Sequence, residues 1–198
     1  MHLRCIHPPQ VDEGSKLSYR LIMDIRLAQE IDLDSILKVI ETAFSDEENK
    51  VIMNLVQELH QETTSPSIKS LFVEVDNQVI GYVSYSPIFL KSDTNITGYI
   101  LAPLAVSPEH QKQGVGSNLI KSGIDMLSRN GVGVLLVYGD PAYYGRFGFK
   151  EEIGRTFTPP YPLEYPFGWT GMMLNETVVP EEPIKFGCVS ALSKPDLW

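Results

Sequence analysis

The feature that most constrains the fold is a helical pattern between two apolar runs in the second half of the chain. The first run, ITGYILAPLAV, covers residues 96–106, and the second, VGVLLVYG, covers residues 132–139 and is typical of a buried strand. Between them lies an apolar stripe at helical spacing, followed by the C-cap signal Asn130-Gly131. The stripe consists of Val115, Leu119, Ile120, Ile124 and Leu127. A strand, a helix and a strand in this order predict a right-handed crossover and two parallel neighbouring strands.

The first third of the chain predicts a short strand and two amphipathic helices. Residues 24–27 favour a strand, and apolar residues recur at helical spacing over residues 33–44 and again over residues 51–59. The first helix can take Asp32 or Asp34 as its N-cap, and the break between the helices is expected near Ser45-Asp46.

The next segments predict strands. Short-period patterns over residues 68–75 and 78–90 flank the turn residues Asp76-Asn77, which indicates a hairpin. With residues 96–106 the hairpin extends to an antiparallel meander. After the crossover, Asp140-Pro141 predicts the start of a short helix, and the residues up to Leu174 favour a final strand pair.

Together these elements predict one α+β domain with a mixed, mainly antiparallel sheet flanked by helices. Residues 1–22 show no period and are expected to be a poorly ordered extension, with Met23 as an alternative start. The domain is expected to cover residues 23–175. Residues 176–198 have little pattern and are expected to form a tail that packs on the domain or extends it.

Charge and cysteine content argue against several classes of protein. A net charge of −9 lacks the basic surface of a nucleic-acid-binding protein, and no apolar run reaches the roughly 18 residues of a membrane span. Cys5 and Cys188 lie at opposite ends of the chain without a metal-binding spacing, so we expect no metal site. The sequence does not decide whether these two cysteines form a disulfide bond. No signal-peptide pattern precedes the domain, so we expect a cytoplasmic protein.

The turn before the central helix, QKQGVGS, has the composition of an anion-binding loop. The first N–H groups of a helix lack intrahelical acceptors, and together they favour a phosphate group. Glycine at positions 114 and 116 allows that phosphate to approach the backbone. A capping turn without a ligand is the alternative.

Two common nucleotide-binding motifs do not fit this turn. The dinucleotide fingerprint requires a third glycine where Leu119 stands, and a phosphate-binding P-loop requires glycine before Lys121-Ser122, where Ile120 stands. Both motifs also follow a parallel strand, whereas this turn follows a meander.

A third pattern fits. Gln111-x-x-Gly114-x-Gly116 after an apolar strand, with GDPAYYGRFGF about 25 residues further on, resembles the GCN5-related N-acetyltransferase (GNAT) superfamily, and in particular its YhbS-like branch. The element order over about three quarters of the chain agrees. The resemblance implies the GNAT-type acyl-CoA N-acyltransferase fold, acetyl-CoA as cofactor and coenzyme A as product.

The resemblance also implies where acetyl-CoA binds. Two central strands, residues 100–106 and 132–138, are expected to diverge and to hold the pantetheine arm on backbone groups of Leu104, Ala105 and Val106. The pyrophosphate is expected on backbone N–H groups of the turn. These groups belong to Gln111, Lys112, Gln113, Gly114, Val115, Gly116 and Ser117.

Tyr144 is the implied catalytic residue and a further cofactor contact. Transfer of an acetyl group to a neutral amine passes through a tetrahedral intermediate and releases a thiolate, which a protonated tyrosine can stabilise. Tyr144 matches the tyrosine of a Tyr-x-x-x-Gly-Phe segment in these enzymes, and Tyr143 is the adjacent alternative. Many members carry an asparagine at the position of Val137, so no asparagine role is transferred.

The acceptor is an amine that the sequence leaves open. A small molecule or a peptide amine fits equally, and the acidic composition slightly favours cationic amines. Glu41, Glu47 and Glu48 either flank the acceptor or form a solvated face, and no general base is assigned. A homodimer is compatible with the resemblance, and the alternative to an enzyme is a non-catalytic acyl-CoA-binding regulatory module.

Overall fold

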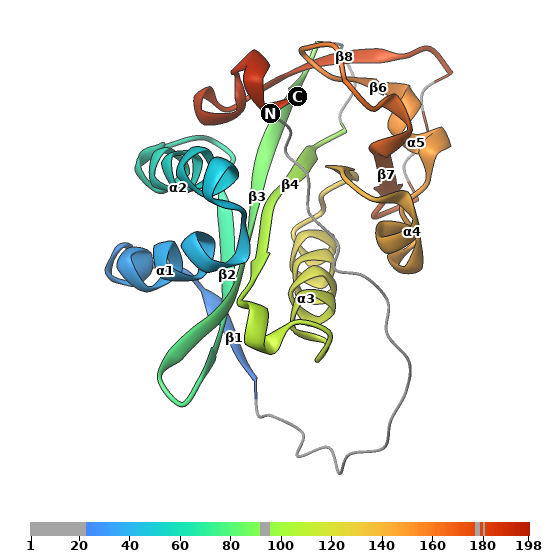
Figure 1. Ribbon diagram of the computed structural model, residues 1–198. Coiled ribbons are helices and arrows are strands. Elements are labelled where there is room, and N and C mark those ends of the chain that lie inside the picture. Colours follow the sequence, from blue (N-terminus) through green and yellow to red (C-terminus); the bar gives the residue numbers. More distant parts are fainter. Residues whose placement is uncertain (1–22, 92–95, 177–178, 180) are drawn as a thin grey trace.

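The strands of the protein form one mixed sheet. The computed structural model describes residues 23–91, 96–176, 179 and 181–198, and its strands follow the order β1-β2-β3-β4-β5-β7 (Figure 1). The bounds are β1 Asp24–Leu27, β2 Lys69–Val75, β3 Gln78–Leu90, β4 Gly98–Val106, β5 Val134–Tyr138 and β7 Trp169–Met173. β4 and β5 are parallel and the other pairs along this path are antiparallel. The predicted α+β fold, the antiparallel meander and the parallel pairing of the two strands around α3 are therefore confirmed.

Helices cover both faces of this sheet. Side chains of α1 (Leu33–Ala43) and α2 (Asp46–Gln61) pack in one apolar cluster, and those of α3 (Val115–Arg129) pack in another (Figure 1). β5 contributes Leu136 to the first cluster and Leu135 to the second, because successive side chains of a strand point to opposite faces. α4 (Pro141–Tyr144) and α5 (Glu151–Thr156) follow β5. Short 3-10 turns are η1 Glu30–Asp32, η2 Pro108–His110, η3 Gly145–Phe147, η4 Pro166–Gly168, η5 Ser190–Leu192 and η6 Pro195–Leu197.

Asp32 occupies the N-cap position of α1, but its carboxylate makes no hydrogen bond to the first turn of that helix. It accepts two hydrogen bonds of 2.9 Å from the guanidinium of Arg26 in β1, and one of 2.8 Å from the N–H of Gln29. The hydrogen-bonded Arg26 side chain lowers the pKa of Asp32. Asp34, the other predicted N-cap, lies inside the helix. Asp32 therefore links β1 to the start of α1.

The segment after α4 differs from the predicted final strand pair. Residues 151–156 form α5, and β6 (Phe157–Thr158) pairs with the later strand β8 (Ile184–Cys188) rather than with β7. The helix is not evident from the sequence because it is short and contains Gly154. It is held by the indole of Trp169, which donates to the carbonyl oxygens of Gly154 and Phe157 at 2.8 and 2.9 Å.

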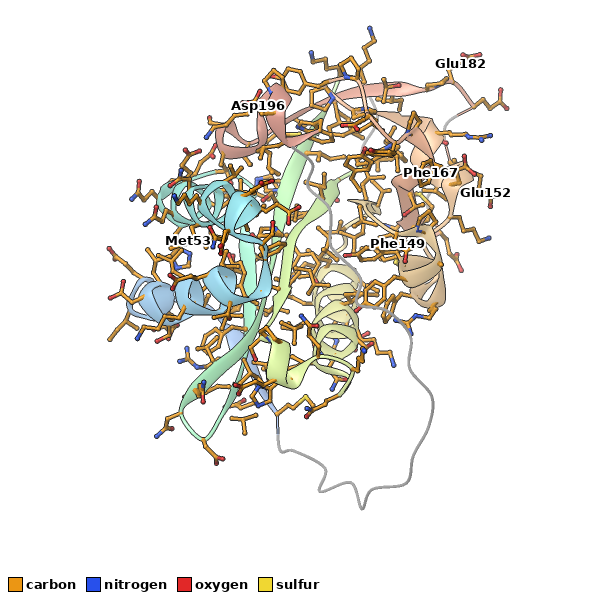
Figure 2. All side chains as sticks on the ribbon, viewed as in Figure 1. Met53, Phe149, Glu152, Phe167, Glu182 and Asp196 are labelled. Atoms are coloured by element: carbon orange, nitrogen blue, oxygen red, sulfur yellow. The ribbon has the colours of Figure 1, made fainter. Side chains whose placement is uncertain are left out.

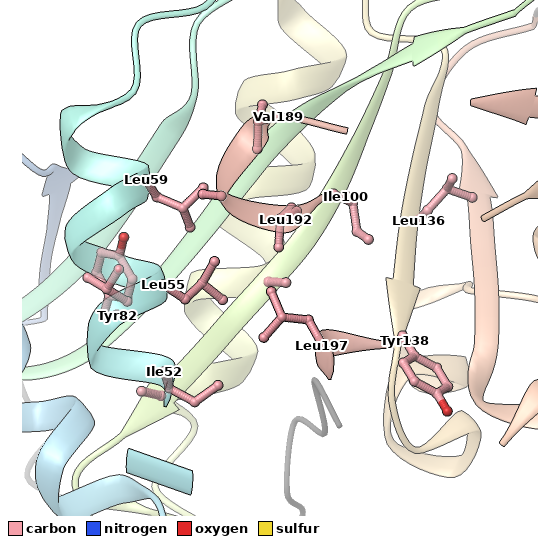
Figure 3. Packing of buried hydrophobic residues seen from close by; sticks show 14 of the residues in the cluster. Ile52, Leu55, Leu59, Tyr82, Ile100, Leu136, Tyr138, Val189, Leu192 and Leu197 are labelled. Carbon is pink, nitrogen blue, oxygen red and sulfur yellow. The ribbon is translucent and has the colours of Figure 1, made fainter. Parts of the chain in front are cut away.

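The C-terminal residues fold back onto the domain. β8 pairs with Ile88–Leu90 at the end of β3, beyond the stretch of β3 that β2 covers. Three apolar residues that follow β8, Val189, Leu192 and Leu197, then lie between α2 and the sheet (Figure 3). The carboxylate of Glu62, just after α2, accepts the N–H groups of Ser190 and Ala191 at 2.6 and 2.9 Å.

Some expectations concern residues outside the described part of the chain, namely the N-terminal extension 1–22, Cys5 and the loop 92–95. Cys188 is a free thiol, and burial raises its pKa to about 12. Over the described residues, none of the helices has the length and the apolar character that crossing a membrane requires.

Candidate functional site

The pairing of β4 with β5 ends before β4 does, because β5 ends at Tyr138. Their register runs from Gly98–Val134 to Leu101–Val137 and then ends, whereas β4 continues to Val106 while paired with β3. The pairing of β4 with β3 contains a bulge just after this point, because Leu101 opposes Tyr85 and Leu104 opposes Val83. Such bulges redirect a strand and end its pairing. The predicted cofactor edge, Leu104, Ala105 and Val106, lies beyond this point.

The turn between β4 and α3 is held by its own side chains. The amide of Gln111 donates to the carbonyl oxygen of Val106 at 3.2 Å, and that of Gln113 donates to the carbonyl oxygen of Glu109 at 2.8 Å. The hydroxyl of Ser107 and Nδ1 of His110 share a hydrogen bond of 2.8 Å. The two glutamine side chains therefore support the conformation of the turn.

The last residues of the turn adopt left-handed backbone conformations. Lys112 has φ +62° and Gly114 has φ +86°, and the N–H of Asn118 makes the first helical bond to the carbonyl oxygen of Gly114. The N–H groups of Val115, Gly116 and Ser117 precede that bond in α3 and are the ones a helix start leaves without helical acceptors. The Val115 side chain is buried in the α3 cluster, and the Ser117 side chain is half-buried.

The two glycines have different surroundings. A Cβ at Gly114 would meet no atom within 4 Å, so this side of the turn is open. A Cβ at Gly116 would lie 2.9 Å from the hydroxyl oxygen of Tyr143, 3.5 Å from Cγ2 of Val106 and 3.8 Å from Cδ2 of Leu104. Gly116 therefore lies where the α3 N-terminus, the free part of β4 and α4 approach one another.

The adjacent tyrosines of α4 point to different places. Tyr144 is fully buried in the α3 cluster, where its ring meets the ring edge of Phe149 at a centroid distance of 5.6 Å (Phe149 is labelled in Figure 2). Tyr143 is half-buried, and its hydroxyl reaches Gly116. Asp140 accepts from the N–H of Ala142 at 2.9 Å and thereby caps α4, as expected for this residue.

The tyrosine that contacts Gly116 is Tyr143, which the sequence indicated only as the alternative to Tyr144. The motif identifies the tyrosine of a Tyr-x-x-x-Gly-Phe segment, and it does not say which neighbour faces the turn. A four-residue helix is too short to show a repeating apolar pattern, so the sequence does not indicate which of its side chains face the turn.

On the face of the sheet that α1 and α2 cover, three hydroxyl groups lie close to one another near Ala105 of β4. Tyr82 in β3 opposes Ala105, and its hydroxyl shares a 3.0 Å hydrogen bond with Ser70, which in turn bonds Ser84 at 3.1 Å. Burial raises the pKa of Tyr82, so its phenol stays protonated at neutral pH. Glu41 and Glu47 are exposed, and Glu48 accepts from the hydroxyl of Ser45 at 2.7 Å.

A family model described as an acetyltransferase (GNAT) domain matches residues 24–151. The match covers more than half of the chain, so the protein belongs to the GNAT family of acetyltransferases. The predicted family and enzyme class, an N-acetyltransferase, are confirmed.

Two proteins of similar sequence support this family assignment. The chain is 33% identical over 129 residues to the N-acetyltransferase YhbS of Escherichia coli K12, covering 65% of this chain and 74% of that protein. It is 33% identical over 124 residues to the N-acetyltransferase YjhQ of the same organism, covering 62% of this chain and 68% of that protein.

Solved structures show the same fold. YhbS from Escherichia coli in complex with CoA superposes with a TM-score of 0.70 at 26% identity, covering 87% of this chain and 94% of that one. A GNAT acetyltransferase from Brucella melitensis in complex with acetyl-CoA has a TM-score of 0.62 at 24% identity. The match covers 88% of this chain and 100% of that one.

Proposed function

We propose that the protein binds acetyl-CoA between β4 and α3 and transfers its acetyl group to a primary amine. The observation that carries the proposal is that β4 continues beyond the end of β5 and leads to a helix N-terminus whose glycine side is open. The complexes of similar proteins with CoA and acetyl-CoA support this cofactor.

The backbone at the end of β4 is suited to hold the pantetheine arm. Leu104, Ala105 and Val106 use one edge of β4 for pairing with β3, and on the other edge they pair with no strand of the described residues. An extended amide-containing chain can add to such an edge as a further strand would.

The turn is suited to the pyrophosphate. The N–H groups of Val115, Gly116 and Ser117 converge at the positive end of the α3 dipole, and Gln111, Lys112, Gln113 and Gly114 form the turn before them. The open side of Gly114 leaves room that a side chain would fill.

Tyr144 remains the proposed general acid. When bound, acetyl-CoA supplies the thioester; the protein positions the amine, donates an N–H from the 104–106 edge to the thioester oxygen and a phenol proton to the departing sulfur. Tyr144 lies one residue from the tyrosine that reaches Gly116, and its side chain is fully buried.

Two measurements test this function. Acetyl-CoA and CoA are expected to raise the melting temperature, and a panel of small-molecule and peptide amines incubated with acetyl-CoA is expected to identify an acceptor through thiol release. Failure of both ligands to stabilise the protein would remove the proposal.

The full burial of Tyr144 favours one alternative, a non-catalytic acyl-CoA-binding module. Such a module binds CoA, and replacing Tyr144 by Phe changes no measured rate. In the enzyme, Tyr144→Phe is expected to reduce turnover by about 100-fold while CoA affinity changes little.

A further inference from the structure

Arg146 lies beside the proposed cofactor site and is held there by Tyr143. Its Nε donates to the carbonyl oxygen of Tyr143 at 3.2 Å, and its guanidinium carbon lies 4.6 Å from the centroid of the Tyr143 ring and 5.7 Å from that of Phe147. The contact is cation–π in character, and it orients the side chain although Arg146 is exposed.

The Tyr143 ring connects this guanidinium to the α3 N-terminus. One face of the ring carries Arg146, and the hydroxyl at its tip lies against Gly116, close to Val106 and Leu104. Edge contacts with Tyr144 and Phe147, at centroid distances of 5.1 and 5.6 Å, fix the ring in this position. A phenol and a guanidinium of the α4–η3 segment therefore lie next to the α3 N-terminus.

Nε of Arg146 donates to the backbone, so the two Nη groups of this exposed side chain are the ones we consider for ligand contact. None of the ion pairs formed within the described ranges of the chain includes this residue. A guanidinium binds a phosphate with paired N–H groups, and in a chain of net charge −9 a local cation favours the binding of a polyanionic ligand.

We propose that Tyr143 and Arg146 form a second wall of the cofactor site, in which the Tyr143 hydroxyl and the Arg146 guanidinium bind a phosphate group of CoA. The inference rests on the proposed function, and it assigns cofactor recognition to two residues of α4 and η3 in addition to the backbone of the α3 turn. The phosphate is either in the pyrophosphate or at the 3′ position of the ribose.

The test is a titration of the full chain with CoA and with dephospho-CoA. Arg146→Ala is expected to weaken CoA binding by about 10-fold, and Tyr143→Phe by about 3-fold. Wild-type affinity is also expected to fall more steeply with added salt than that of Arg146→Ala, because a charged contact is screened. If dephospho-CoA shows the same loss with Arg146→Ala, the contact is with the pyrophosphate; if the loss disappears, the contact is with the 3′-phosphate.

Arg155→Ala is the matched control. Arg155 lies in α5, is exposed, and pairs with Glu151 at 2.6 Å, so its removal changes the net charge equally without touching the Tyr143 ring. Equal CoA affinity of Arg146→Ala and Arg155→Ala would overturn the inference and leave the proposed function intact. A wild-type protein that does not bind CoA would remove both.

Discussion

The ring of Tyr85 in β3 lies directly on Gly123 of α3. A Cβ at Gly123 would overlap the Tyr85 ring, and the Tyr85 hydroxyl donates to the carbonyl oxygen of Leu119 at 3.1 Å. Gly123 thus allows α3 to approach the sheet closely enough for this buried hydrogen bond. The position of α3, and with it the proposed phosphate site, depends on this contact.

We therefore expect Gly123→Ala to reduce the free energy of unfolding by about 1–3 kcal/mol, because the added methyl group overpacks the interface. Chemical denaturation measures the change. Gly145→Ala is the control, since Gly145 has φ −55° and no atom within 4 Å of an added Cβ. That change should be neutral or stabilising by about 0.4–1 kcal/mol, and an equal loss for both variants would contradict the packing argument.

Substitutions of the two glycines in the turn are expected to have different effects: one should mainly lower stability and the other should mainly weaken CoA binding. Gly114→Ala places alanine at φ +86°, which should cost about 1–2 kcal/mol of unfolding free energy. Gly116→Ala places a methyl group 2.9 Å from the Tyr143 hydroxyl, which should weaken CoA binding about 10-fold or more with a smaller loss of stability. Denaturation and CoA titration are both needed. Unchanged CoA affinity in Gly116→Ala would mean that this glycine serves packing alone.

Two contacts of the C-terminal residues should differ in their energies. Glu62→Ala removes the acceptor for two backbone N–H groups and should cost about 1–2 kcal/mol of unfolding free energy. Lys194→Met removes an ion pair with Glu58, at 2.6 Å, whose side chains are 45% and 44% exposed, and it should cost at most about 1 kcal/mol. A larger loss for Lys194→Met in thermal or chemical unfolding would reverse this ranking.

Asp32 should make stability depend on acidic pH. Hydrogen bonds from Arg26 lower the pKa of the folded-state carboxyl below its ordinary value of about 3.9. A lowered folded-state pKa stabilises the protein above the unfolded-state pKa, and this stabilisation is lost as the pH falls through the folded-state value. The difference in unfolding free energy between wild type and Asp32→Asn should be constant above about pH 5 and shrink towards pH 3. A difference that stays constant to pH 3 would show that Asp32 acts by geometry alone.

The elements that could be predicted from the sequence are those long enough to show a repeating pattern of apolar residues. α1, α2 and α3 each bury one face, and β2 and β3 flank a turn whose residues, Asp76 and Asn77, take φ +51° and +62°. In the helices the pattern of apolar residues follows from burial on one side, whereas β3 is buried along most of its length. The parallel pairing of β4 and β5 could be predicted because a helix connects the two strands.

Other elements depend on partners that are distant in sequence. α5 includes buried Gly154, whose Cβ would clash with the backbone of Trp169, and it packs on β7. β8 pairs with β3 at Ile88–Leu90, an edge that is available because β2 ends its pairing opposite Tyr85. Short segments carry too few residues for a period, so these pairings were not predicted.

The sequence by itself determined the family, the order of the main elements and the turn at residues 111–117, because local spacing and glycine positions are properties of neighbouring residues. Only the tertiary structure decided which tyrosine faces that turn. Tyr144 is drawn into the apolar cluster beside Phe149, and this burial leaves Tyr143 to reach Gly116 with Arg146 stacked on its ring. The orientation of a four-residue helix is set by the surface it packs on, which its own residues do not specify.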